Sequence, residues 1–456
     1  MRLSEALHLE SISRLALVGA GGKTTALFQI ARDLLMPVGT AQTVLVSVTT
    51  HLALEQIDLA DHSFIVRNPD QVDKIGADLP SGVLLFTGVA QEQDRLGGLY
   101  GAVLDRLRDL ADRIQAPLLV EADGARRLPL KAPASHEPLV PDWSEQVVVV
   151  AGLRGLNRTL DQSWVHRPEA FARLCGLKLG DTISLQALER VLTHPKGGLK
   201  DIPPAARRIA LLNQADTPLL TSSGGQLAQN LLGHYQAVLV AALSPPGNSG
   251  DRIFSGVHAV FEPAAGVVLA AGGASRLGKP KQLLLWKNEP LVRHAVKSAL
   301  EGGLSPVIVV SGAYGDEVSK AVVDLPVQLV QNPDWLDGQS TSMRAGLAAL
   351  PPETGAVVFL LADQPQVPAV MVRELVAYHR RTLAPVIAPM VDGQRSNPVL
   401  FDRQVFPILS KVVGDVGGRA VFSQFPTAWL PWHDSSLLLD VDRPEDYQAL
   451  LEMPAE

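Results

Sequence analysis

Two glycine-rich segments constrain the fold of this 456-residue chain most, because each directly follows a short apolar run. The first run, 15–18, leads into Gly19-Ala-Gly-Gly-Lys-Thr-Thr25, and the second, 264–269, leads into a glycine and lysine segment that extends to 285. Glycine has no Cβ, so such a segment can turn tightly and bring backbone N–H groups close to a ligand. The two segments therefore predict two α/β units, each with a loop suited to phosphate.

Composition and charge favour a globular protein and argue against nucleic-acid or membrane partners. A chain of this length exceeds one ordinary domain, and 46% hydrophobic with 19% charged residues is typical of a globular protein. The net charge of −7 indicates no general affinity for nucleic acids. No apolar run is long enough for a membrane span, and the N-terminus lacks a signal-peptide pattern. We expect a cytoplasmic protein that acts on small molecules, with no nucleic-acid or membrane partner.

The first glycine segment is predicted to lie between a strand and a helix that runs through residue 35. This order is the P-loop arrangement, in which loop N–H groups and a lysine bind phosphate and a hydroxyl can ligate Mg²⁺. Leu17 occupies the position of the motif's first glycine, so the loop more closely resembles the compact phosphate loops of Mur ligases. We predict a second nucleotide site, for ATP or GTP, formed by Gly19, Gly21, Gly22, Lys23, Thr24 and Thr25.

Two further strand ends in the first half carry polar residues. The predicted strand 117–120 runs into Glu121 and Asp123, either of which could hold Mg²⁺, unless they form only an acidic turn. The strand 208–212 ends in Asn213-Gln-Ala-Asp216, which resembles the base-recognition motif of GTPases with Gln214 in place of its lysine. Base recognition and a simple polar turn both remain open for this segment.

Three motifs together, GAGGKTT, VTTH and EADGARRLPLKAP, resemble the selenium-dependent hydroxylase accessory family over about residues 1–245. The resemblance implies a role in the maturation of molybdenum-containing hydroxylases. It names no reaction for this half of the chain.

A Pro/Gly/Ser-rich connector at 244–251 predicts the join between the two halves. We predict a P-loop-like α/β domain over 1–255 and a second α/β domain over 262–456. Strands and helices alternate after residue 289, which favours a Rossmann-like, mostly parallel sheet in the second domain.

Acidic residues in the second half are predicted to lie where strands end. The apolar strand 355–361 leads into Asp363, and a carboxylate at such an end is well placed to hold Mg²⁺ near a phosphate loop. Residues 437–439 are interpreted as a strand that runs into Asp440 and Asp442. Because alternate strand residues point to opposite faces, Asp442 is the predicted second metal ligand and Asp440 the fallback.

The pattern L-A-A-G-x-x-x-R-L-G-x-x-K over 269–281 resembles the opening signature of the MobA-like nucleotidyltransferases. The resemblance implies that Arg276 and Lys281 bind the triphosphate and that these two act in catalysis with Asp363. In 392–401 the chain departs from the family, with Ser396 and Asn397 in place of a glycine and a histidine. The implied nucleotide-binding residues are Leu269, Ala270, Ala271, Gly272, Gly273, Lys281, Ser311, Gly338, Ser342 and Asp363.

The reaction implied by this resemblance is transfer of CMP from CTP to the phosphate of molybdopterin, with Mg²⁺. The segments 270–272 and 279–282 look more like the cytidylyl than the guanylyl branch. An apo molybdenum hydroxylase is the expected protein partner. The alternatives are a guanylyl or sugar-phosphate nucleotidyltransferase, or a non-catalytic carrier that inserts the molybdenum cofactor.

Overall fold

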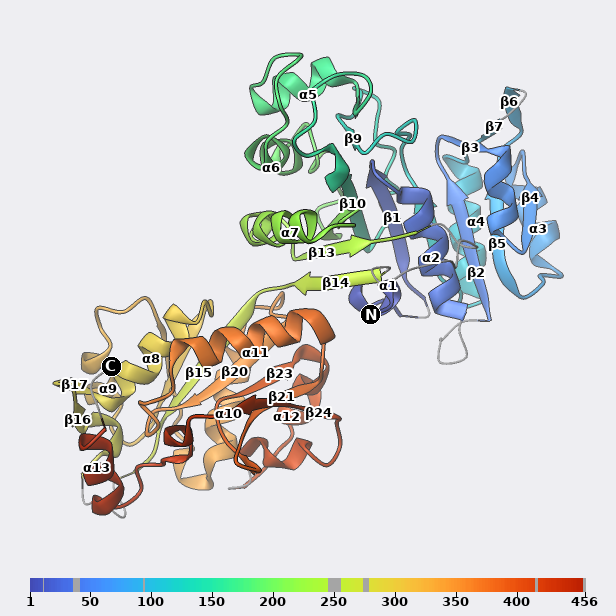
Figure 1. Cartoon of the computed structure of the whole chain (residues 1–456). Helices are drawn as coiled ribbons and strands as arrows, with labels where there is room; N and C mark the ends of the chain where they lie inside the picture. Colours follow the sequence, from blue (N-terminus) through green and yellow to red (C-terminus); the bar gives the residue numbers. More distant parts are fainter. Residues whose placement is uncertain are drawn as a thin grey trace. The chain divides into compact units, whose positions relative to one another are not determined.

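The computed structural model describes residues 1–10, 12–35, 42–92, 95–244, 256–273, 279–414 and 417–453 (Figure 1). The chain divides into two compact units, Met1–Phe261 and Glu262–Glu456. They are called the N-terminal unit and the C-terminal unit below.

The N-terminal unit is built on a nine-stranded sheet with the order β14-β13-β12-β10-β1-β8-β2-β5-β4. All neighbours in this sheet are parallel except β13 and β14. Its strands are β1 (Arg14–Gly19), β2 (Thr43–Val48), β4 (His62–Ile65), β5 (Gly82–Thr87), β8 (Leu118–Glu121), β10 (Gln146–Gly152), β12 (Arg207–Asn213), β13 (Ala237–Ala242) and β14 (Gly256–Phe261). The central strands are buried apolar runs, as strands covered on both faces must be.

Two small sheets extend this unit. One joins β3 (His51–Ala53), β7 (Arg95–Gly97) and β6 (Ala90–Glu92), and the other pairs β9 (Leu130–Lys131) with β11 (Val165–His166). The second pairing holds the segment after β8 against the segment that precedes α5, which matters for the polar cluster described below.

Seven helices of the described residues accompany this sheet: α1 (Leu3–Ala6), α2 (Lys23–Leu35), α3 (Pro69–Gly76), α4 (Ala102–Arg113), α5 (Pro168–Cys175), α6 (Leu185–Thr193) and α7 (Pro218–Leu231). α2 starts immediately after the glycine segment and packs on β1, β2, β5 and β8. α7 begins with a Thr217 cap, whose hydroxyl accepts from the Leu220 N–H, and with Pro218 at its first position, both favourable for a helix start.

β14 lies outside both predicted domains and was not foreseen. It pairs antiparallel with β13 at the edge of the N-terminal sheet, so the chain adds one reversed strand before it enters the second unit. The next strand, β15, starts only three residues later, which leaves a very short connection at the boundary.

The C-terminal unit contains a mixed sheet with the order β19-β18-β15-β20-β23-β21-β22, and β24 pairs with β21. β19, β18, β15 and β20 are mutually parallel, whereas β23 is antiparallel to both of its neighbours. The strands are β15 (Ala264–Ala270), β18 (Val307–Ser311), β19 (Gln328–Gln331), β20 (Ala356–Leu361), β21 (Val386–Val391), β22 (Gln394–Arg395), β23 (Val399–Asp402) and β24 (Thr427–Trp432), with a separate hairpin of β16 (Leu285–Trp286) and β17 (Glu289–Pro290).

Helices cover both faces of this sheet. α8 (Leu291–Glu301) and α11 (Ala369–Thr382) contribute to one hydrophobic core, and α10 (Gln339–Ala348) and α12 (Phe406–Leu409) to the other. α9 (Gly315–Ala321) and α13 (Pro444–Leu451) complete the described helices of this unit. No helix in the described ranges combines the length and the apolar character that a bilayer crossing requires.

The prediction of a strand over 437–439 was wrong. Residues Ser435–Leu438 form a short 3₁₀ helix that starts after Asp434, whose carboxylate accepts from the Ser436 N–H. The chain therefore does not alternate faces as it approaches Asp440 and Asp442, and the argument that only one of them reaches the site fails.

Adjacent glycines in α7 provide a matched test of packing. A Cβ on Gly224 would lie 2.9 Å from side-chain methyl groups of Leu153 and Val240, whereas a Cβ on Gly225 would meet nothing closer than 3.6 Å. We expect Gly224→Ala to lower the free energy of unfolding by about 1–3 kcal/mol, because the site is already filled. Gly225→Ala should instead leave it unchanged or raise it by up to about 1 kcal/mol through helix propensity. Urea unfolding of both variants measures the difference, and equal effects would contradict this packing.

Candidate functional site

A cavity of about 800 Å³ opens at the C-terminal ends of β15 and β20 in the C-terminal unit. These two strands are parallel neighbours, with Leu269 beside Leu361, so the segments that leave them meet at one edge of the sheet. Of the predicted site residues, those that line the cavity are Leu269, Ala270, Ala271, Gly272, Gly273, Lys281, Gly338, Ser342, Asp363 and Asp442. Ser311 is buried at the end of β18 and is not among the lining residues.

One predicted residue cannot be placed. Arg276 lies in 274–278, outside the described residues. The role of Arg276 in triphosphate binding therefore stays a prediction.

The ammonium group of Lys281 is held between two carboxylates. Its Nζ donates to Asp442 Oδ1 at 2.8 Å and forms an ion pair with Asp363. Asp440 joins them, since ligand oxygens of Asp363, Asp440 and Asp442 all lie within 4.8 Å of one another. The structure thus brings together both aspartates that the sequence argument treated as alternatives.

The charged groups in this cluster change one another's pKa values. Burial, and then the neighbouring Asp363 carboxylate, raises the pKa of Asp440 to about 7. Burial would lower the pKa of Lys281, but Asp363 and Asp442 outweigh it and raise that pKa above its usual value. Three carboxylates around one cation are the oxygen-rich donor set that Mg²⁺ or Mn²⁺ prefers, so these residues fit a divalent metal.

Gln282 holds the glycine segment in place, a role that the sequence reasoning missed. Its buried side-chain amide donates to the carbonyl oxygen of Gly272 at 3.1 Å and to that of Ala270 at 3.4 Å. The segment's backbone carbonyls are thereby turned toward Gln282. A glutamine next to a lysine gives no sequence signal for this contact, because its partners are backbone carbonyls.

Basic and aromatic residues also line the cavity. Arg395, Arg419 and Phe422 line it, and the Arg395 guanidinium lies 4.3 Å from the centre of the Phe422 ring. Burial, and then the nearby Arg419, lowers the pKa of Arg395. Ser396 and Asn397, which replace the family's glycine and histidine, also line the cavity. Arg395 was not singled out from the sequence.

The predicted second site lies at the corresponding edge of the N-terminal sheet. Lys23 is buried, and its Nζ donates to the Gly19 carbonyl at 2.7 Å and pairs with Asp123 at 3.2 Å and Glu121 at 3.6 Å. The Thr24 hydroxyl donates to Glu121 at 2.8 Å. Both acids that the sequence left as alternatives therefore lie near the loop.

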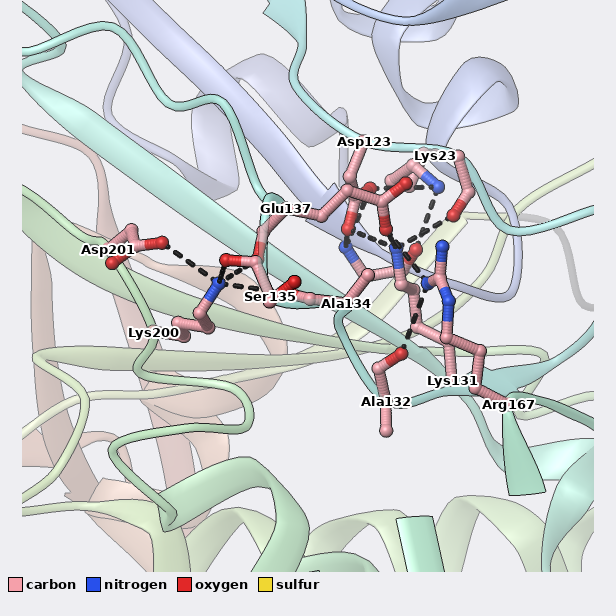
Figure 2. Close-up of polar contacts among 12 residues, drawn as sticks. Lys23, Asp123, Lys131, Ala132, Ala134, Ser135, Glu137, Arg167, Lys200 and Asp201 are labelled. Atoms are coloured by element: carbon pink, nitrogen blue, oxygen red, sulfur yellow. Dashed lines mark hydrogen bonds and ion pairs between the residues drawn. The ribbon is translucent and has the colours of Figure 1, made fainter. Parts of the chain in front are cut away.

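The polar cluster continues away from the loop (Figure 2). Lys131 lies between Asp123, at 2.7 Å, and Glu137, at 3.1 Å, and Arg167 pairs with Glu137 at 2.8 Å. Burial opposes the charge of Glu137, but Arg167 and Lys131 lower its pKa to about 2. The cluster therefore alternates cations and carboxylates.

The Asn213–Asp216 segment also lies near the loop. The buried Asn213 side chain donates to the Gly21 carbonyl at 2.7 Å and accepts from the Leu243 N–H at 2.9 Å. Asp216 pairs with Arg154 at 2.5 Å. These contacts account for Asn213 as a structural link, and base recognition by this segment stays a prediction.

Comparison with known proteins finds a matching family model for each half of the chain. Residues 15–169 match the family model described as YqeC protein, and residues 266–428 match the MobA-like NTP transferase domain. The chain is 34% identical to the protein YqeC of Escherichia coli (strain K12) over 205 residues, which is 44% of this chain and 75% of that protein.

Two relatives match the other half. Nicotine blue oxidoreductase of Paenarthrobacter nicotinovorans is 34% identical over 197 residues, covering 41% of this chain and 95% of the relative. The molybdenum cofactor cytidylyltransferase of Escherichia coli (strain K12) is 22% identical over 182 residues, covering 40% and 92%. With these matches, the chain belongs to two families at once, the YqeC proteins through its N-terminal half and the MobA-like NTP transferases through its C-terminal half.

Proposed function

We propose that the C-terminal unit transfers CMP from CTP to the terminal phosphate of molybdopterin and releases pyrophosphate. The product is a cytosine dinucleotide form of the cofactor, and an apo molybdenum hydroxylase is its proposed recipient. The observation that carries the proposal is the cavity in which the glycine segment, Lys281 and three carboxylates meet.

Each group of residues has its own role in the proposed nucleotidyl transfer. Backbone N–H groups of the glycine segment 271–273 and the Lys281 ammonium neutralise triphosphate oxygens, and positioning supplies most of the catalysis. An acceptor phosphate oxygen forms a bond to the α-phosphorus while the bond from that phosphorus to the bridging oxygen breaks. Pyrophosphate leaves with the electron pair, so no side chain has to act as the nucleophile.

Asp363, Asp440 and Asp442 would hold a divalent metal, proposed to be Mg²⁺. Such an ion stabilises negative charge on the phosphate that is transferred. Lys281 pairs with two of these carboxylates, so it would have to leave Asp363 and Asp442 for the metal to bind both of them. The same side chain would then serve the triphosphate.

Similarity to the cytidylyltransferase supports the choice of CTP and molybdopterin. A second candidate comes from the oxidoreductase, which is more similar to this chain than the cytidylyltransferase is. That candidate is an oxidoreductase reaction in the same cavity. It gives no reason for three carboxylates around a lysine, which is why we rank it second.

The full-length chain tests the proposal directly. We expect pyrophosphate release with molybdopterin and CTP, slower release with GTP, and no oxidation of NADH or NADPH. Release with GTP alone would reject the cytidylyl assignment, and oxidation of a nicotinamide cofactor without pyrophosphate release would favour the second candidate. Binding of the finished cofactor without any transfer would favour a carrier.

Asp363→Asn should lower kcat for CMP transfer by about 10²–10³-fold, because it removes a charged metal ligand at nearly constant shape. Asp324→Asn is the matched control, since Asp324 forms an ion pair with Arg293 and does not line the cavity. Transfer rates at saturating CTP compare the two variants. An unchanged rate in Asp363→Asn would exclude this aspartate from the chemistry.

Lys281→Met should increase the affinity for free Mn²⁺ by about tenfold, which corresponds to ~1.4 kcal/mol, because it removes a cation that competes for the same carboxylates. The same variant should lose CMP transfer. Mn²⁺ titration followed by electron paramagnetic resonance, without nucleotide, measures the affinity.

Lys287→Met is the control for this experiment, since Lys287 lies over the Trp286 ring and does not line the cavity. Its Mn²⁺ affinity should equal that of the unmodified chain. A lower Mn²⁺ affinity in Lys281→Met than in this control would show that the lysine does not compete with a metal.

A further inference from the structure

The N-terminus of α2 presents backbone donors that the chain itself does not use. The N–H groups of Ala20 and Gly21 donate to Val150 and Leu128 carbonyls. By contrast, those of Gly22, Lys23, Thr24 and Thr25, which open the 13-residue helix α2, have no acceptor among the described residues. Helix N-termini of this kind bind phosphate through such donors and the helix dipole.

A buried lysine belongs to the same helix start as these donors. The Lys23 side chain is only 3% exposed and reaches Asp123 and Glu121. The loop therefore places an ammonium group next to the free N–H groups, where an anion would be stabilised.

The Asp123 carboxylate is bound by the kinds of donor that bind anions. Its two oxygens accept from the Gly19 N–H at 3.1 and 3.0 Å, and it also pairs with Lys23 at 3.2 Å and Lys131 at 2.7 Å. A backbone N–H of a glycine loop and two ammonium groups are the donors that phosphate sites use. Because Lys131 also neutralises Asp123, Lys23 can turn to another anion without leaving this buried carboxylate unpaired.

A divalent cation is indicated by Thr24 and Glu121. The Thr24 hydroxyl follows the loop lysine and donates to the buried Glu121 carboxylate at the end of β8, the pairing of hydroxyl and acid that holds Mg²⁺ beside a bound triphosphate.

An unsatisfied hydroxyl lies at the same sheet edge. Thr49 follows β2, and its N–H donates to the Glu121 carbonyl at 2.9 Å. Its side chain is buried, with the residue 5% exposed, and its hydroxyl finds no partner in the described part of the chain. A buried polar atom without a partner calls for a bound water, ion or ligand.

We propose that the N-terminal unit binds a nucleoside triphosphate together with a divalent cation. The phosphates lie on the N–H groups of 22–25 and on Lys23, and the cation lies between Thr24 and Glu121. A nucleoside is proposed in place of bare phosphate because the Asn213–Asp216 segment, whose sequence pattern leaves base recognition open, is tied to the loop by the Asn213 contact with the Gly21 carbonyl. This site is independent of the cytidylyl function proposed for the C-terminal unit.

The test uses the full-length chain with Asp363→Asn, so that metal-dependent binding in the C-terminal unit is weakened, and the difference between this parent and its Thr24→Val variant isolates binding in the N-terminal unit. Equilibrium dialysis with labelled ATP and GTP, with and without Mg²⁺, measures binding. We expect saturable, Mg²⁺-dependent binding of at least one of the two nucleotides, and at least a tenfold loss of affinity in Thr24→Val. Lys23→Gln should abolish binding, but it leaves buried carboxylates unpaired, so Thr24→Val, which changes no charge, is the decisive variant.

Thr193→Val is the matched control, because the Thr193 hydroxyl donates to a backbone carbonyl of the same unit, that of Glu189 in α6, at 2.9 Å. It should bind as the parent does. Absence of Mg²⁺-dependent binding of both nucleotides, or equal affinities in Thr24→Val and Thr193→Val, would overturn the proposal. Inorganic triphosphate that binds as tightly as the nucleotides would overturn the assignment of a nucleoside.

Discussion

One interaction recurs in both units: a lysine that follows a strand and its glycine segment pairs with carboxylates. In the N-terminal unit Lys23 meets Glu121 and Asp123, and in the C-terminal unit Lys281 meets Asp363 and Asp442. Parallel pairing of β1 with β8 and of β15 with β20 brings each lysine to the sheet edge of Glu121 and Asp123 or of Asp363, whereas Asp442 comes from the segment after the 3₁₀ helix Ser435–Leu438. Removing the lysine would take a cation away from each group of acids, and breaking such a buried pair typically costs about 3–5 kcal/mol. The ion pairs therefore help two acid-rich edges to exist in the folded chain.

The two lysine–carboxylate pairs differ in solvent exposure, and this difference favours a different role for each. The side chain of Lys23 is 3% exposed and that of Lys281 is 25% exposed. In the N-terminal unit, Lys131, Glu137 and Arg167 extend the pair into a closed network whose charges balance. In the C-terminal unit the pair faces a cavity of about 800 Å³, where two substrates can reach the same acids. The enclosed network of the N-terminal unit favours tight binding of one ligand. The open cavity of the C-terminal unit suits a transfer of a charged group between two ligands.

Much of this organisation could be predicted from the sequence, because it depends on local patterns. Apolar runs followed by glycines predict strand, loop and helix in both halves, and the structure has β1 followed by α2 and β15 followed by the glycine segment. The errors have a common cause, which is dependence on distant pairing. β14 is a strand only because β13 offers an antiparallel edge, and its own residues alternate weakly in burial. Asp440 lies beside Asp442 and Asp363 because the chain before it forms a 3₁₀ turn, whereas the period-2 argument assumed a strand. Gln282 could not be found because its partners are backbone carbonyls of Ala270 and Gly272, which any residue type supplies.

The cavity of the C-terminal unit is lined by both acidic and basic residues, which come from different parts of the chain. Asp363 follows β20, whereas Arg395 lies in β22 and Arg419 in the 3₁₀ helix Gly417–Val421. β21 and β22 form an antiparallel hairpin, and the strand that follows them, β23, lies between β20 and β21. Acidic and basic groups in one cavity can orient a ligand that carries both a metal-bound group and free phosphate oxygens. The antiparallel hairpin thus matters for the site, since it brings Arg395 to a cavity whose Asp363 follows a parallel strand.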